Sequence, residues 1–246
     1  MKLREILDYL TDGELSQLSI GGGDPGQIRE EDYPKVIRTI NLALVNLFTR
    51  FSLKEGLLEL VLDPDITRYV LTSAHTVSAN VSGQPHYIND SVDIPFKDDL
   101  LKIQAIKTLA GKELPFNVLD HQYSCNSPSH DVLEVPSALV LQSSDLPDHY
   151  KTTSLMVSYR AAHPQLPTAG TINPDEIEVA LPYAYLEPLL YFVAARSHHP
   201  SSLTSEINPA TSYYAKYERA CQLLQNTNLD LDRDESSTKF RARGWV

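Results

Sequence analysis

The spacing of hydrophobic residues changes twice along this chain, and those changes limit its fold more than any single motif does. Over residues 33–51 apolar side chains recur at steps of three and four, which predicts one amphipathic helix of about five turns. Residues 30–32 are all acidic and place negative charge where the helix dipole favours it. Residues 1–15 predict a shorter amphipathic helix. The chain therefore opens with two helices.

From Gly56 the pattern becomes short and alternating, with Asp, Pro, Ser and Gly between the apolar runs. This region is predicted to be rich in β-structure. One helix is expected inside it, over residues 98–110, because the apolar residues there follow helical spacing. The expected strands are residues 57–62, 66–77, 138–141, 154–159 and 177–181.

Helical spacing returns after Pro182. Residues 183–197 predict one helix, and the pair Asn208 and Pro209 is typical of the start of another, which is expected to end near Asn226. Residues 228–246 are rich in Asp, Ser, Lys and Arg and have no apolar period, which predicts an extended arm.

These patterns predict an α+β fold in which the N- and C-terminal helices form one antiparallel bundle. A β-rich domain is inserted between them, and an extended C-terminal arm follows. The expected boundaries are 1–55 for the N-terminal helices, 56–181 for the β-rich domain, 182–227 for the C-terminal helices and 228–246 for the arm.

The composition disfavours several classes of function. A formal net charge of −11 is unsuited to a phosphate-binding surface, since nucleic-acid affinity depends on clustered cations. Such acidity serves solubility, and it would also let a DNA duplex slide past without sticking. Cys125 and Cys221 are too few and too far apart for a disulfide framework or a metal knuckle. No apolar run approaches the length of a membrane span, so no membrane association is expected.

An acidic motif near the C-terminus resembles a calcium-binding loop only in part. Asp230, Asp232 and Asp234 match the opening of such a loop, but Glu235 and Arg241 occupy the positions that require glycine and a bidentate glutamate. We therefore expect no metal site there.

Histidines in the middle of the chain are the candidates for acid–base chemistry. His121, His130 and His149, with Asp120 and Asp131, occupy loop-like sequence, and nothing in the pattern fixes their geometry. No nucleophile motif accompanies them. We expect no catalytic residues and no cofactor.

Two groups of side chains are candidates for protein contacts. The last two predicted helices carry six tyrosines suited either to core packing or to a subunit interface, and five of them are the interface candidates. They are Tyr185, Tyr191, Tyr213, Tyr214 and Tyr217. The predicted arm carries aromatic and cationic residues typical of interface anchors, including the only Trp of the chain. They are Phe240, Arg241, Arg243 and Trp245.

The C-terminal third resembles the head-to-tail adaptor (connector) proteins of tailed bacteriophages. The resemblance rests on residues 155–164, 177–182, 185–196 and 210–220. The apolar pair Ile6 and Leu7, together with the helix at 33–51, also suits this family. The resemblance covers about half of the chain, and the motifs that carry it are hydrophobic patterns without a catalytic signature.

The resemblance implies an antiparallel helical core that assembles into a twelve-fold ring beneath the portal of the virion. The implied partners are the portal protein, further copies of the chain, and tail nozzle or tail-tube and fibre proteins, and DNA passes through the lumen without specific binding. Residues 183–226 would belong to the ring-forming core, and residues 240–246 would dock on the portal. The implied location is the virion neck, after assembly in the host cytoplasm.

Two other functions stay open from the sequence. One is a different structural part of the virion, such as a tail nozzle or a tail-completion protein. The other is a phage hydrolase that uses the loops of His121, His130 and His149.

Overall fold

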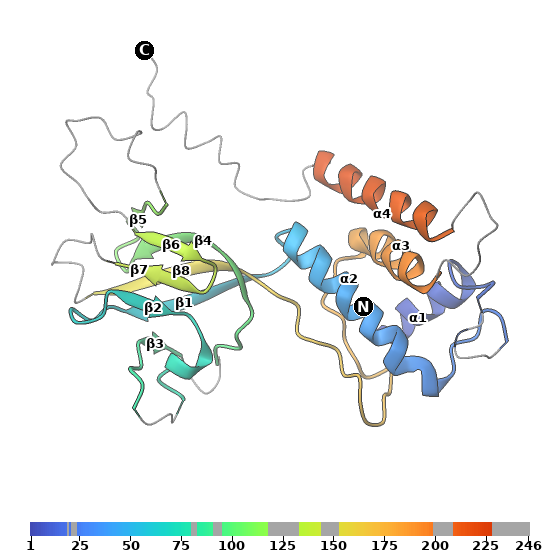
Figure 1. Cartoon of the computed structure of the whole chain (residues 1–246), viewed down its shortest axis with the longest axis horizontal. Coiled ribbons are helices and arrows are strands. Elements are labelled where there is room, and N and C mark those ends of the chain that lie inside the picture. The colour runs from blue at the N-terminus through green and yellow to red at the C-terminus, as the bar shows by residue number, and fades with distance from the viewer. Residues whose placement is uncertain are drawn as a thin grey trace, which may run out of the picture. The chain divides into compact units, whose positions relative to one another are not determined.

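The computed structural model describes residues 1–18, 20, 24–79, 83–90, 95–117, 133–143, 153–198 and 209–227. In these residues the fold is mixed α+β, with four α-helices and two antiparallel sheets (Figure 1). The chain divides into two compact units: Met1–Leu53 joins His163–Val246 in one, and Lys54–Ala162 forms the other. We call them the helical unit and the β unit.

The helical unit contains the four helices that the apolar spacing predicts. They are α1 (Leu3–Asp12), α2 (Tyr33–Arg50), α3 (Leu186–Ser197) and α4 (Pro209–Asn226). A 3₁₀ turn over Glu30–Asp32 leads into α2, and another over Tyr183–Tyr185 leads into α3. Pro34 lies in the first turn of α2, where its missing N–H breaks no helical hydrogen bond.

The centre of the helical unit is α3, which packs against α1, α2 and α4. Its side chains are therefore buried on most sides, whereas α1 and α2 each bury one stripe. The buried α3 residues are Leu186, Pro188, Leu189, Leu190, Phe192, Val193 and Ala194. In Figure 1, α3 lies between α2 and α4.

The predicted strand at residues 177–181 is wrong. This segment is extended, but it makes only the isolated bridge between Lys2 and Glu178. Its backbone bonds to the chain start: the Val179 N–H donates to the Met1 carbonyl at 2.9 Å, and the Leu3 N–H donates to the Ile177 carbonyl at 3.0 Å. No second strand of a sheet lies beside it in the described residues, and its alternating pattern reflects the burial of Val179 and Leu181 with Glu178 and Ala180 exposed.

The β unit consists of two antiparallel sheets. The larger has the order β3–β1–β8–β4–β5, with β1 Glu55–Val61, β3 Ile88–Asn89, β4 Leu100–Thr108, β5 Glu113–Leu114 and β8 Ser154–Ala161. The smaller has the order β2–β7–β6, with β2 Arg68–Val70, β6 Glu134–Ser137 and β7 Val140–Gln142. The 3₁₀ turn η2 covers Ser73–His75.

The helix predicted over residues 98–110 is also wrong, because this segment forms strand β4, which lies between β8 and β5 in the larger sheet. Its pairing with β8 shifts register twice, between Leu100 and Lys102 and between Ile103 and Ala105. Each irregularity moves the inward-facing positions along by one residue. Leu100, Ile103 and Ile106 are therefore all buried at a spacing of three, which in sequence is the spacing of a helix.

A close packing contact fixes the junction of β1 and β8. Gly56 lies opposite Tyr159, and a Cβ at Gly56 would stand 2.2 Å from the Tyr159 Cζ atom. The Tyr159 hydroxyl donates to Asp99 Oδ1 at 3.0 Å, and Lys54 Nζ lies 2.7 Å from Asp99 Oδ2. Gly56 therefore provides the space in which the tyrosine ring lies across the strand pair.

Among the described residues, no helix has both the length and the apolar composition that crossing a membrane would require.

Candidate interaction surface of the helical unit

Two of the five candidate interface tyrosines are core residues of the helical unit. The Tyr185 ring meets the Phe51 ring edge-on at 5.0 Å, and the Tyr217 ring meets the Phe192 ring in the same way at 5.3 Å. The Tyr217 side chain is 1% exposed, and its hydroxyl donates to Asn46 Oδ1. Both rings join helices inside the unit.

The other three tyrosines lie at or near the surface formed by α3 and α4. Tyr191 and Tyr213 are half-buried, with ring centres 6.3 Å apart, and Tyr214 is 52% exposed. The ammonium of Lys216 lies 4.8 Å from the Tyr213 ring centre and 5.7 Å from that of Tyr191, so it makes a cation–π contact with both. Tyr213 also stacks on His198 at 5.0 Å.

Hydrogen bonding holds Tyr191 in its neutral form. Its hydroxyl donates to Glu187 Oε1 at 2.7 Å, and this bond, with partial burial, raises the pKa of Tyr191 to about 12. Burial likewise raises the pKa of the Tyr213 phenol. Both phenols are therefore donors rather than general bases near neutral pH. Their chemistry suits contact rather than catalysis.

A polar cluster connects α2 to α4. Arg50 forms an ion pair with Glu218 at 2.8 Å, and both side chains are partly buried. Behind the pair, Cys221 is fully buried, and burial raises the pKa of its thiol. A buried thiol of this kind is a weak nucleophile. The cluster therefore ties the helices together and presents no reactive group.

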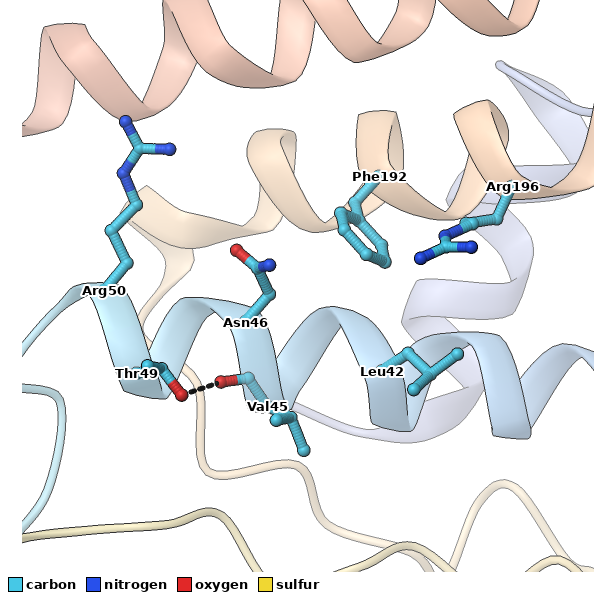
Figure 2. A pocket seen from close by; sticks show the side chains of 7 residues that line it. All are labelled: Leu42, Val45, Asn46, Thr49, Arg50, Phe192 and Arg196. Carbon is cyan, nitrogen blue, oxygen red and sulfur yellow. Dashed lines mark hydrogen bonds between the residues drawn. The ribbon is translucent and has the colours of Figure 1, made fainter. Parts of the chain in front are cut away.

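Beside this cluster, α2 and α3 form an open groove of about 340 Å³ (Figure 2). The groove is lined by Leu42, Val45, Asn46, Thr49, Arg50, Phe192 and Arg196. Its lining is mainly apolar, and an arginine stands toward each end. No carboxylate or imidazole is among the lining residues.

The groove exists because α2 has apolar residues outside its buried stripe. Leu42 is 52% exposed and Val45 is 49% exposed, while the neighbouring Ala43 and Leu44 are in the core. From α3, Phe192 points toward α2, and the guanidinium carbon of Arg196 lies 5.6 Å from the Phe192 ring centre. A helix face that contacts only water usually carries polar side chains, and the outer face of α2 carries these two apolar ones instead.

Sequence reasoning did not single out this groove, although a signal was present. Leu42 and Val45 are apolar but do not fall on the stripe that the helical period of 33–51 defines. Off-stripe apolar residues on a strongly amphipathic helix indicate a second contact surface. The part supplied by α3 was hidden, because Phe192 and Arg196 belong to a helix that is buried on most sides.

Other candidates from the sequence lie outside the described residues. These are the arm residues Phe240, Arg241, Arg243 and Trp245, the three histidines His121, His130 and His149 with Asp120 and Asp131, and Cys125. Within the part of the chain that the structure covers, no three His, Cys, Asp or Glu side chains are grouped so that they could hold a metal ion.

No protein-family model matches the chain, and no curated protein matches it.

Proposed function

We propose that this chain is a structural subunit of a tailed bacteriophage, a head-to-tail adaptor that forms a ring on the portal and receives the tail. In this proposal the helices of both chain halves form one antiparallel bundle, and the β unit is inserted into it. The chain extends the DNA channel and carries out no chemical step.

One observation carries the proposal. The helices before and after the β-rich region belong to the same compact unit, although more than one hundred residues separate them in sequence. That arrangement agrees with the antiparallel helical core, sometimes with a β-rich insertion, that the resemblance to adaptors implies, and the segments that resemble adaptors include α3 and α4 of the helical unit. The net charge of −11 agrees with a channel that DNA passes without sticking.

The character of the described surface also agrees with a structural role. The half-buried tyrosines and the apolar groove offer the aromatic and aliphatic area on which protein contacts are built. In the proposal, Tyr191, Tyr213 and Tyr214 face neighbouring subunits, and Phe240, Arg241, Arg243 and Trp245 dock on the portal.

The decisive experiment mixes the purified full chain with the portal ring encoded by the same genome and measures the mass of the product. We expect several copies of the chain on each portal. The double substitution of Arg243→Ala with Trp245→Ala should weaken binding by about 1000-fold, because Trp and Arg anchors often account for about 2 kcal/mol each. Arg219→Ala, on the exposed side of α4, is the control and should leave binding unchanged.

The opposite result has a clear meaning. If the full chain and the portal do not bind, the adaptor proposal is wrong, and the same measurement is then made with the tail proteins of that genome. Binding to a tail protein alone would identify a nozzle or tail-completion protein. Binding to neither would direct work to a hydrolase screen with alanine variants of His121, His130 and His149.

A further inference from the structure

We propose that the groove between α2 and α3 receives residues 229–235 of a second copy of this chain. The inference deepens the proposed function and rests on it, because it names a contact through which one subunit holds the next. It assigns the groove to a peptide that alternates apolar and acidic side chains.

The groove combines an apolar floor with positive charge. Leu42, Val45 and Phe192 are the apolar residues of the lining, which we call the floor, and Figure 2 shows Arg50 toward one end and Arg196 near Leu42 toward the other. The two ends are about 12 Å apart, since eight helical residues separate Leu42 from Arg50. An occupant must therefore offer apolar side chains and at least one carboxylate over this length.

The two arginines are not equivalent. Arg50 is already paired with Glu218 at 2.8 Å, whereas Arg196 is exposed and lies over the Phe192 ring. A guanidinium stacked on an aromatic ring keeps its N–H edge available for a carboxylate. Arg196 is therefore the main charged contact for an incoming acidic peptide.

Residues 229–235 have the sequence Leu-Asp-Leu-Asp-Arg-Asp-Glu, and their side-chain pattern complements the groove. In an extended peptide Leu229 and Leu231 point to one side, about 7 Å apart, and Asp230 and Asp232 point to the other. The two leucines therefore fit within the length of about 12 Å between Leu42 and Arg50. The leucines can cover the floor while a carboxylate meets Arg196.

The reach of the chain favours a second copy over the same copy. α4 runs in the same direction as α2 (Figure 1), and its last residue lies eight positions beyond Glu218, which is about 12 Å past Arg50. A return to Arg50 in the same copy would use about four extended residues. Leu229 and Leu231 would then lie in the return path and would not reach the floor at Leu42.

The test measures fluorescence anisotropy of a labelled synthetic peptide of residues 227–236 titrated with the full chain. We expect saturable binding that weakens as salt rises, since charge pairing contributes to it. Arg196→Glu should weaken the binding of the peptide by about tenfold, because it replaces a charge attraction by a repulsion. Arg219→Glu makes the same charge change on the exposed side of α4 and should have no effect.

A second pair of variants tests the floor. Leu42→Glu changes a half-exposed side chain, so it leaves the core intact and should abolish peptide binding. A peptide with Leu229→Ser and Leu231→Ser should also fail to bind. Circular dichroism of each protein variant confirms that the helices are kept, so that loss of binding reports on the groove.

Three outcomes would overturn the inference. The first is no binding of the native peptide, and the second is equal binding by the Arg196→Glu and Arg219→Glu proteins. The third is binding only by a full chain whose own Leu229 and Leu231 are serine, which would place the segment in the groove of its own copy. The peptide assay contains no portal, so its failure is distinct from a failure of portal docking.

Discussion

Gly56 has no side chain, and the ring of Tyr159 occupies the space that a side chain at this position would need. Because a Cβ at Gly56 would meet the buried Tyr159 ring at 2.2 Å, the Gly56→Ala variant must displace the ring or the strand. We expect it to lower the free energy of unfolding by about 1–3 kcal/mol, the usual effect of overpacking. Urea unfolding measures this. In a Tyr159→Ala background the same glycine change should have little effect, and equal losses in both backgrounds would contradict the contact.

The phenol of Tyr159 makes the stability of the β unit sensitive to high pH. Burial and the neighbouring Asp99 carboxylate raise the pKa of Tyr159 well above its ordinary value near 10. The neutral phenol is therefore favoured in the folded state, so this stabilisation is fully present below pH 10 and is lost as pH rises further. We expect unfolding free energy to fall above pH 10 by about 1.4 kcal/mol per pH unit for each such tyrosine.

The comparison of two phenylalanine variants isolates this effect. Tyr159→Phe should reduce the slope of unfolding free energy against pH between pH 10 and 11. Tyr214→Phe removes a hydroxyl from an exposed ring on α4 and is the control for the substitution itself. Identical slopes for the wild-type chain and Tyr159→Phe would show that this phenol does not set the alkaline limit.

Among the elements, helices were predicted better than strands, and β4 shows why. Helical spacing defines α2 over many residues, so single exceptions do not hide it. In β4 two register shifts place Leu100, Ile103 and Ile106 on one face, and a local pattern cannot reveal them because they depend on the partner strand. The groove was missed for a related reason, since it needs the pairing of α2 with α3.

The central place of α3 predicts where substitutions act most strongly. Leu189 is fully buried, and Leu189→Ala should lower the free energy of unfolding by about 2–5 kcal/mol through lost burial and a residual cavity. Leu223 on α4 is 57% exposed, and Leu223→Ala should change the free energy of unfolding by less than about 0.5 kcal/mol. Thermal and urea unfolding of both variants test this difference. Similar effects would show that α4 is covered by another surface in solution.

At the scale of the whole molecule, each unit has its own core, so a defect in one core should stay local. Gly56→Ala acts between β1 and β8, and Leu189→Ala acts within α3. Native-state hydrogen exchange followed by mass spectrometry should show faster exchange in β1, β4 and β8 for the first variant. For the second it should show faster exchange in α2, α3 and α4.

The pattern of exchange decides how the two units are coupled. If both variants accelerate exchange equally in the helices and the strands, the units unfold as one cooperative body, and the separate-core prediction fails. If exchange stays local, the β unit can change its stability without loosening the bundle. In the proposed ring that separation has a use, because the helical surface that holds neighbouring subunits would remain ordered while the β unit adapts to a different partner.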